Sequence, residues 1–483
     1  MSLDPRRPFD PDDPATGPLP VYTDPGDEGY HQTLSNLQIQ MIAIGGAIGV
    51  GLFLGIGTRL ATAGPGLIVS YLVVSVVIYL LMRALGELVL YRPTTGAFVS
   101  YAREFVSDRL AFMTGWIYVA LAALAGIAEI AALAVYVQYW VPQVPGWIPS
   151  LVAALTIVGC NLLSVRVFGH IEFWASAIKV TAIILFLLAG VGIVVATDVF
   201  GAGGQASVAN LWRNGGFLPH GGIALVIVLS GVVFSFSAVE IVGVSAGEAK
   251  DPAKAMPTAI NSVVVRIALF YIGSIAVLAM LLPTDAYSGA ESPFVTALAS
   301  LHVPGLAGVM NFVVLSAAIS GVNATLYAAV RLLRNLAAHG QAPRATVWVS
   351  RRGVPAGGLL TVGCVYLIGI GLIYVAGASH AFEVVLSACA VFILFGWISI
   401  FLSHLGYRRA LAAGRVVASS FRMPGSPATD YVCLVFLVAV ALYMMFDMRN
   451  PTWWHSLVAG VLIVGATNLG YEVTRRRARS ARP

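Results

Sequence analysis

Four ionisable residues stand inside stretches of the chain that are otherwise apolar. Lys179 lies in "EFWASAIKVTAIILF", Glu129 in "GIAEIAALAVY" and Glu240 in "FSFSAVEIVGVSAGE", while Glu383 stands near the start of a later apolar run. A charge in an apolar medium costs several kcal/mol, so such residues usually have a function or a partner. Desolvation favours the neutral amine, which lets a lysine in this position bind and release a proton. The structural alternative is a permanent Lys–Glu pair that holds helices together.

The run "MIAIGGAIGVGLFLG" at 41–55 is also apolar, yet it carries five glycines: Gly45, Gly46, Gly49, Gly51 and Gly55. Glycine costs a helix interior about 1 kcal/mol relative to alanine, and in lipid a freed backbone group finds no water. A break in a helix is therefore tolerated where it lines a site, because the N–H groups that it exposes bind anions such as a carboxylate. The alternative is that the glycines form a close-packing face against another helix. The sequence leaves both interpretations open.

The elements that must position these residues are membrane-spanning helices. The chain has 483 residues, of which 58% are hydrophobic and only 10% charged, whereas soluble domains contain about 25% charged residues. These values exclude a soluble globular protein and indicate an all-α polytopic membrane protein. Twelve apolar segments are long enough to cross a membrane. They lie at about 38–62, 66–90, 110–140, 147–165, 172–196, 222–247, 260–283, 304–330, 357–376, 381–406, 430–447 and 454–473.

Basic residues are distributed as the positive-inside rule requires for these twelve spans. If both termini are cytoplasmic, the external loops hold only Arg59, Arg213 and Arg449, and Lys179 lies within a span. The other 24 of the 28 Lys and Arg residues then lie in internal loops and in the tails. We therefore expect a multi-pass protein of the plasma membrane, which is the inner membrane in a bacterium. The net charge of +6 reflects this topology and indicates no nucleic-acid partner.

The two ends of the chain differ from the apolar segments between them. Residues 1–35 are rich in Pro, Asp and Gly and have no apolar core, which indicates a disordered cytoplasmic tail and no cleavable signal peptide. Residues 475–483, "RRRARSARP", form a basic cytoplasmic tail. This tail is expected to lie against anionic lipid headgroups.

No combination of residues points to a cofactor, a metal ion or an enzyme. The cysteines stand singly within apolar segments, without the paired spacing of a metal site or a disulfide framework. They are Cys160, Cys364, Cys389 and Cys433. The spans contain no "HExxH" motif, no Ser/His/Asp set and no carboxylates at catalytic spacing,. A nutrient sensor would be expected to carry a folded soluble signalling domain, for which the sequence has no candidate.

Several runs of residues together resemble the amino acid permeases of the amino acid, polyamine and organocation superfamily. They are "LSNLQIQMIAIGGAIGVGLFLG", "AGPG", "RALGELVLYRPTTGAFVSYARE", "NLLSVRVFGHIEFWASAIK", "GEAKDPAKAMPTAINSV" and "SPFVTALA". The resemblance implies a LeuT-like fold in which helices one and six are discontinuous. The implied transport core, 36–407, consists of two inverted five-helix repeats at about 36–197 and 220–407. Two additional helices would follow at 428–474.

The resemblance also implies a substrate site at the two discontinuous helices. Backbone N–H groups of the first helix would bind the substrate carboxylate, at Ala47, Ile48, Gly49, Val50 and Gly51. Carbonyl groups of the sixth helix would bind the amine, around Phe236, Ser237 and Ala238. Phe234 matches an aromatic lid that closes the site toward the outside, and Glu129 is expected at the same site.

Charged residues match positions that relatives use for coupling and gating. Lys179 matches a lysine whose ammonium stands, in proton-coupled relatives, where sodium-coupled members hold a cation, so the resemblance implies proton coupling. Glu240 matches an acidic residue tied to gating. Glu87, at the cytoplasmic end of the second span, is interpreted as an anchor or gate with Arg83 and Arg92, mainly through a structural salt bridge.

Three positions depart from the pattern of the family. Val50 lacks a hydroxyl that many relatives have there, and Ala122 stands near a position usually occupied by tryptophan. The run 323–325 reads Asn-Ala-Thr where Asn-Ser-Gly or Asn-Ala-Gly is common. Each departure is expected at a wall of the site, which predicts a pocket of altered shape and polarity.

The favoured interpretation is a proton-coupled importer of an amino acid that works by alternating access. The runs "GYHQTL", "MRALGELVLYRPTTGAFVSYAREF" and "AAGRVVASSFRMPGSPATDY" are most similar to L-asparagine permeases, which implies L-asparagine or another small polar amino acid. The run "VYVQYWVPQVPGW" is similar to permeases for D-serine, D-alanine and glycine. These substrates, GABA or another amine-bearing solute are alternatives, as is an exchanger without proton coupling.

Overall fold

The computed structural model describes residues 40, 48–94, 96–163, 165–201, 204–245, 251–348, 354–446 and 453–480. Every regular element in these ranges is a helix. The predicted tail at 1–35, Ala47 and Arg449 lie outside the described residues. At the other end of the chain, the last helix continues to Ser480, into the basic segment predicted as a tail.

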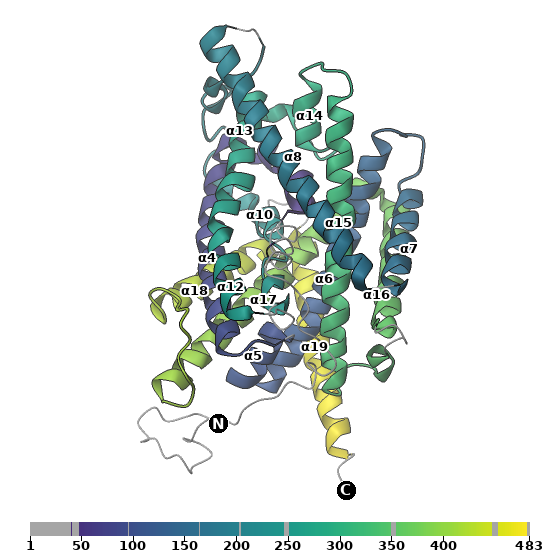
Figure 1. The fold of residues 1–483 in the computed structure, drawn as a ribbon, viewed down its shortest axis with the longest axis vertical. Helices are drawn as coiled ribbons and strands as arrows, with labels where there is room; N and C mark the ends of the chain where they lie inside the picture. Colours follow the sequence, from purple (N-terminus) through teal and green to yellow (C-terminus); the bar gives the residue numbers. More distant parts are fainter. Residues whose placement is uncertain are drawn as a thin grey trace.

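The long helices run mostly along the longest axis of the molecule (Figure 1). The first half of the chain forms α2 (Val50–Phe53), α3 (Gly55–Ala63), α4 (Leu67–Tyr91), α5 (Ala97–Phe105), α6 (Asp108–Gln138), α7 (Trp147–Leu163) and α8 (Val165–Phe200). The middle forms α9 (Ile223–Ile227), α10 (Leu229–Ser235), α11 (Ile241–Ser245), α12 (Pro252–Arg266), a π-helical turn (Ile267–Gly273), α13 (Ser274–Leu281) and α14 (Pro293–Ala299). The remainder forms α15 (Leu306–Ala338), α16 (Ala356–Ala376), α17 (Ala378–Ala412), α18 (Ala428–Phe446) and α19 (Trp453–Ser480).

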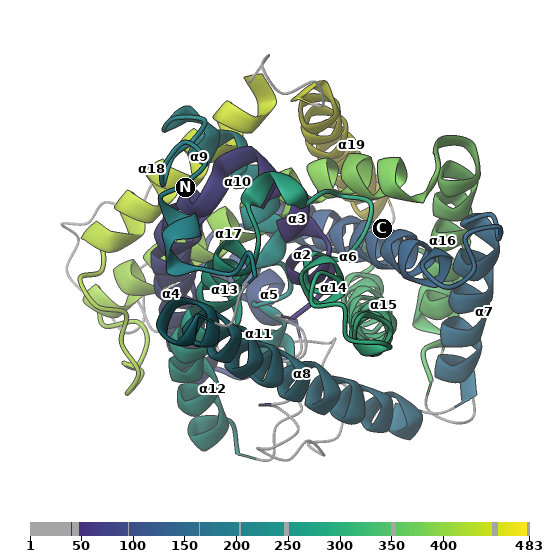
Figure 2. The same ribbon diagram turned by 90° about the horizontal axis from the view of Figure 1, so that it is seen from above.

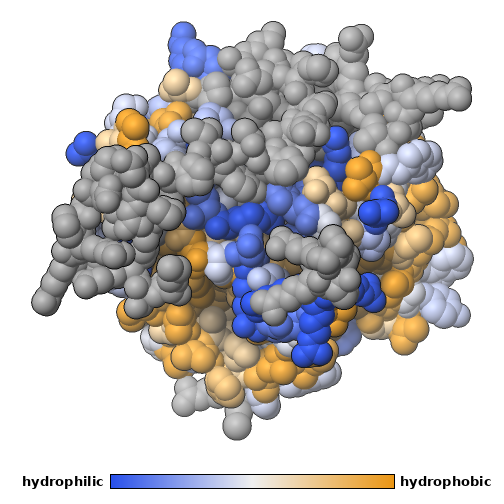
Figure 3. Space-filling model, turned by 90° about the horizontal axis from the view of Figure 1, so that it is seen from below, coloured by the Kyte–Doolittle hydropathy of each residue, from blue (hydrophilic) through white to orange (hydrophobic). Residues whose placement is uncertain are grey.

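Eight helices in the described ranges are long and apolar enough to cross a membrane. They are Gly55–Tyr91, Asp108–Gln138, Phe173–Phe200, Leu306–Ala338, Ala356–Ala376, Ala378–Ala412, Ala428–Phe446 and Trp453–Arg477. Two shorter apolar helices, Trp147–Leu162 and Leu269–Leu281, fall on two further predicted spans. Viewed from below, hydrophobic residues cover the sides of the molecule and hydrophilic residues gather in the middle of the visible face (Figure 3). These features are those of a multi-pass helical membrane protein.

Helix α6 forms the centre of the bundle. Of its most apolar stretch, 89% is buried, whereas the corresponding figure for Trp453–Arg477 is only 11%. Helices α15 and α17 pack along α6, while α7, α16, α18 and α19 lie at the periphery when the molecule is seen from above (Figure 2). The interior therefore consists of α6, α15 and α17 together with the short helices that contact them.

Two of the predicted spans are interrupted inside this bundle. Helix α2 begins at Val50 and gives way to α3 after Leu54. The sixth predicted span is divided into α9, α10 and α11, and 236–240 form no helix between α10 and α11. Ala238 in this gap has a φ of +68°, a backbone conformation that residues with a Cβ adopt rarely. Because α10 packs against α2, the two interruptions lie side by side.

Candidate functional site

A small cavity lies where the two interruptions meet α6 and α15. Its volume is about 20 Å³, which is room for about one water molecule. An amino acid can therefore enter only if the surrounding elements move apart. The cavity is lined by Gly49, Gly51, Ala125, Glu129, Phe234, Ser235, Ser237, Ala238, Gly321, Ala324 and Thr325.

Glu129 brings a carboxylate from α6 to the backbone of the first interrupted helix. Its side chain is buried, and Oε1 accepts a hydrogen bond from the Val50 N–H at 3.4 Å. A Cβ at position 49 would lie 2.8 Å from Oε1, and a Cβ at Gly321 of α15 would overlap the carboxyl group. Glycines from two different elements thus leave room for this side chain. The Val50 N–H, predicted to face a substrate carboxylate, faces the Glu129 carboxylate.

Ser235, the last residue of α10, joins the two interrupted helices. Its Oγ shares its one hydrogen between the Gly51 carbonyl oxygen at 3.1 Å and the Gly231 carbonyl oxygen at 2.9 Å, and it lies 2.8 Å from the Tyr71 hydroxyl of α4. The Tyr271 hydroxyl donates to the Ser235 carbonyl oxygen at 2.7 Å. A Cβ at Gly51 would lie 2.7 Å from the Ser235 Cα, so Gly51 allows the two backbones to touch. Close packing is thus the role of Gly51, whereas Gly49 faces the carboxylate.

The interruption after α10 presents a mixed wall to the cavity. Phe234, Ser237 and Ala238 line it. The Phe234 ring also meets Phe382 of α17 edge to face, with ring centroids 6.4 Å apart. Phe236 points elsewhere: its ring stacks on Tyr271 with centroids 4.9 Å apart and also contacts Tyr71. Only the backbone of Phe236 is therefore available for the predicted contact with an amine.

Lys179 is fully buried on α8 and touches two other elements. Its Nζ donates to the Ile48 carbonyl oxygen at 3.2 Å and to the Ser320 Oγ of α15 at 3.0 Å. Ile48 directly precedes the glycine that borders the cavity, and Ser320 precedes Gly321. The ammonium group thus lies behind the cavity and ties the start of the first interrupted helix to α15 and α8.

Glu240 lies at the end of the second interruption, 1% exposed. Its Oε2 accepts a hydrogen bond from the Trp397 Nε1 of α17 at 3.2 Å, and its carboxylate also interacts with the Tyr118 hydroxyl of α6. This carboxylate therefore links the interruption to the two central helices and does not line the cavity.

The predicted site residues that the structure describes fall into three groups. Six of them line the cavity: Gly49, Gly51, Glu129, Phe234, Ser237 and Ala238. Ile48, Val50 and Phe236 border it without lining it, and Lys179 and Glu240 stand one layer behind. Sequence reasoning missed Ser235 and Gly321, which carry no signal beyond their residue types. Of the departures from the family pattern, Ala324 and Thr325 line the cavity, whereas Val50 and Ala122 do not.

The prediction that Arg59 lies in an external loop is wrong. Arg59 belongs to α3 and is 6% exposed. Its guanidinium donates to the Gly55 carbonyl oxygen and lies 3.9 Å from Glu383 of α17. Gly231 of α10 leaves the space that the guanidinium occupies. The span predicted at 38–62 already includes position 59, and α3 ends at Ala63, so Arg59 should have been counted within the span.

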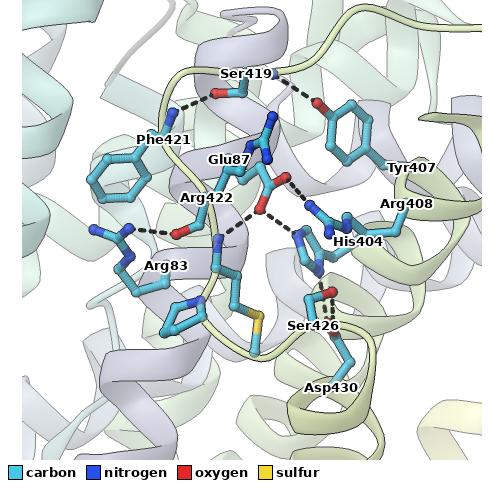
Figure 4. A network of polar contacts seen from close by, with 12 residues as sticks. Arg83, Glu87, His404, Tyr407, Arg408, Ser419, Phe421, Arg422, Ser426 and Asp430 are labelled. Atoms are coloured by element: carbon cyan, nitrogen blue, oxygen red, sulfur yellow. Dashed lines mark hydrogen bonds and ion pairs between the residues drawn. The ribbon is translucent and has the colours of Figure 1, made fainter. Parts of the chain in front are cut away.

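The partners predicted for Glu87 are also wrong. Its Oε1 accepts from the Arg408 Nη1 at 2.9 Å, and its Oε2 lies 3.1 Å from the His404 Nε2 (Figure 4). Arg92 instead pairs with Glu104 at 2.6 Å. The correct partners lie more than 300 positions along the chain, beyond the reach of local sequence reasoning.

A bundle of membrane-spanning helices, with a cavity of mixed polar and apolar lining at two interrupted helices in its interior, is typical of a membrane transporter,. A family model described as amino acid permease matches residues 38–481. The chain belongs to this family of amino acid transporters.

Individual relatives are similar over almost their whole length. The chain is 44% identical over 472 residues to an L-asparagine permease of Streptomyces coelicolor, covering 97% of this chain and 95% of the relative. It is 46% identical over 454 residues to L-asparagine permease 2 of Mycobacterium tuberculosis, covering 93% and 92%. It is 44% identical over 462 residues to an L-asparagine permease of Escherichia coli, covering 93% and 90%.

Proposed function

We propose that this transporter imports L-asparagine, or another small polar amino acid, across the plasma membrane by proton symport and alternating access. The observation that carries the proposal is the similarity to L-asparagine permeases over more than nine-tenths of this chain. The cavity lining supports it, because Glu129, Ser237 and Thr325 offer polar groups to a polar side chain.

In the proposed binding mode the substrate lies across the two interruptions. N–H groups of the first interrupted helix, at Gly49, Val50 and Gly51, bind its carboxylate. Backbone carbonyl groups at 236–238 bind its amine. Phe234 closes the site toward the outside, since it stands between the cavity and Phe382 near the start of α17. The cavity must widen from about 20 Å³ for each substrate molecule, and alternating access supplies this movement.

Lys179 is the proposed carrier of the coupled proton. As an ammonium it donates to the Ile48 carbonyl and to Ser320. When it loses the proton, it loses its charge and one donor, so its hold on the backbone at Ile48 weakens. The first interrupted helix can then shift relative to α15. Occupancy of this single proton site would thus bias the equilibrium between two conformations. Glu240 would gate through its link to Trp397.

The proposed architecture is the twelve-span, LeuT-like arrangement, with inverted repeats at about 36–197 and 220–407 and two additional helices at 428–474. It is supported by the eight long helices, the two shorter ones and the interrupted sixth segment, with Gly55–Tyr91 holding both α3, the end of the first predicted span, and α4, the second predicted span. At one end of the bundle, called the basic end, Arg83, Arg92, Arg103, Arg408 and Arg422 lie around the ends of α4, α5 and α17. By the positive-inside rule this end and both termini face the cytoplasm, with the arginine-rich end of α19 near anionic headgroups.

Uptake into proteoliposomes tests the function. Purified protein is reconstituted, an inward proton gradient is imposed, and labelled L-asparagine, D-serine, D-alanine, glycine and GABA are compared. If one proton accompanies each substrate, a difference of one pH unit can support about tenfold accumulation, and collapse of the gradient should abolish it. Accumulation of a different solute would replace the proposed substrate, and accumulation that ignores the gradient would refute proton symport.

The Lys179→Ala variant distinguishes a proton symporter from an exchanger. In a symporter this variant should lose gradient-driven uptake, while counterflow from preloaded vesicles persists, because exchange of substrate for substrate moves no net proton. Ser316→Ala, on the same helix as Ser320 and partly buried, is a control that should keep both activities. Gradient-driven uptake at the normal rate by Lys179→Ala would refute the role of this lysine.

A further inference from the structure

A second cluster of titratable groups lies at the basic end, away from the cavity. The His404 cluster consists of Glu87 on α4, His404 and Arg408 on α17, and Asp430 on α18. Figure 4 shows the four side chains converging, with the loop between α17 and α18 folded over them. The side chains of Glu87, His404 and Asp430 are each at most 1% exposed, and Arg408 is 24% exposed. Nothing in the proposed transport mechanism uses these groups.

The hydrogen-bond partners of His404 indicate a protonated ring. The His404 Nδ1 lies 2.7 Å from Asp430 Oδ1, and Nε2 lies 3.1 Å from Glu87 Oε2. A neutral imidazole has one donor and one acceptor, whereas ionised carboxylates only accept. Both ring nitrogens therefore donate only if the ring carries a second proton. Imidazolium and guanidinium then balance the two carboxylates, and the buried cluster is neutral.

The other bonds of the two carboxylates favour this assignment. Glu87 Oε2 also accepts from the Met423 N–H at 2.7 Å, and Oε1 accepts from Arg408. Asp430 Oδ2 accepts from the Ser426 Oγ at 2.6 Å. A proton placed on Glu87 would displace the Met423 N–H or the Arg408 guanidinium. A carboxylic acid is also a stronger acid than an imidazolium ion, so we assign the extra proton to the ring rather than to Asp430. Among the described residues, other titratable or charged groups near the cluster are Arg83, Tyr91, Tyr407, Arg409, Arg422, Tyr431 and Cys433.

The cluster fastens three parts of the chain together. Glu87 holds the loop backbone at Met423, His404 holds Asp430 at the start of α18, and Ser426 closes the loop onto the same carboxylate. Arg83 adds a bond to the Arg422 carbonyl and stacks on the Phe421 ring, 3.7 Å from its centroid. Helix α18 and its loop are thus fixed to the end of α4 and to α17.

We propose that His404, Glu87 and Asp430 form a proton-binding site at the basic end, separate from Lys179, and that its proton keeps the loop and α18 fixed to the bundle. When the ring gives this proton to water at the basic end, the cluster changes from neutral to one net negative charge. One ring nitrogen then faces a carboxylate without a hydrogen between them, and the loop is released. The inference goes beyond the proposed function, because it does not depend on which solute is carried.

The first test observes the proton directly. Nitrogen NMR of the full chain, labelled at histidine, is compared with the His404→Gln variant to identify the His404 signals. Both ring nitrogens of His404 should have imidazolium shifts at pH 7. A neutral ring at pH 6 would overturn the proposal.

The second test observes the loop. Amide hydrogen exchange of peptides covering 419–426 is measured between pH 6 and pH 9 and corrected for the chemical exchange rate. In the wild type, protection should fall as pH rises, by up to about tenfold per unit for one linked proton. Asp430→Asn should remove this dependence, because an amide can pair with a neutral ring; Glu87→Gln provides the same test at the other ring nitrogen.

Glu104→Gln is the matched control. Glu104 is a mostly buried carboxylate at the same end, bonded to Arg92 and Tyr91 rather than to a histidine, so this variant should keep the pH dependence of the wild type. Protection that is independent of pH in the wild type, or equal dependence in Asp430→Asn and the wild type, would overturn the proposal. Neither test involves transport, so the result stands apart from the outcome of the uptake experiment.

Discussion

Replacing Gly49 with alanine should weaken substrate binding without unfolding the protein. The new Cβ would lie 2.8 Å from the Glu129 Oε1, whereas ordinary contacts begin at 3.4 Å, so the carboxylate must withdraw by about 0.6 Å. The atom that must move is the far end of a flexible side chain, which keeps the cost to stability low. The methyl group would, however, occupy a cavity of about 20 Å³ beside the N–H groups proposed to hold the substrate carboxylate.

The expected loss of affinity comes from overlap between the new methyl group and the bound substrate. If this overlap costs as much as overpacking in a filled core, about 1–3 kcal/mol, it corresponds to about 5- to 150-fold in Kd. Labelled asparagine binding to the purified protein gives Kd, and thermal unfolding gives Tm. Gly465→Ala on α19, where a Cβ meets nothing within 4 Å, should change neither value.

Gly51→Ala makes the contrast informative. There the Cβ would lie 2.7 Å from the Ser235 Cα. A backbone atom cannot relieve this overlap by a side-chain rotation, so both Tm and the affinity for the substrate should fall. Normal binding by Gly49→Ala would refute the placement of the substrate carboxylate. A Tm loss in Gly49→Ala as large as in Gly51→Ala would show that position 49 serves packing.

Three further predictions concern the elements around the cavity. Ser235→Ala removes a hydroxyl that bonds Gly51 and Tyr71 and should cost about 1–3 kcal/mol of stability, measured as a lower Tm; an unchanged Tm would contradict this joint. Trp397→Phe leaves the buried Glu240 Oε2 without its indole donor and should slow uptake and lower Tm, whereas Trp454→Phe, at an exposed position, should do neither. Cysteines introduced at Asn214 and at Ala413, both in exposed loops, should react with a membrane-impermeant thiol reagent from opposite sides of the membrane, and labelling from one side would contradict the proposed topology.

Functional residues could be predicted from the sequence where a residue type was energetically unfavourable in its sequence context. Lys179 and Glu129 stood out because charges are costly in apolar runs, and the structure places both at or beside the cavity. The glycines of the first interrupted helix stood out for the same kind of reason. Their separate roles were not predictable, because the difference between Gly49 and Gly51 lies in which distant atom each one meets.

Contacts between distant parts of the chain were the main failure of prediction. Glu87 was assigned to the arginines nearest in sequence, but the fold brings Arg408 and His404 to it from the far end of α17. Ser235 carried no signal, because a serine inside an apolar helix commonly bonds the carbonyl four residues earlier, as this one does with Gly231. What distinguishes Ser235 is the second bond to Gly51, which exists only in the folded molecule.

The bond between Ser235 and Gly51 restricts how α2 and α10 can move relative to each other. Since the backbones of α2 and α10 touch at Gly51 and Ser235, neither helix can slide past the other without losing a buried contact. Helices α2 and α10 are therefore expected to move as one rigid unit, although they come from segments more than 180 positions apart. A hinge for this unit must lie in a non-helical stretch. Residues 236–240, with Ala238 in the left-handed conformation, form such a stretch. A displacement of either helix would therefore move both walls of the cavity together.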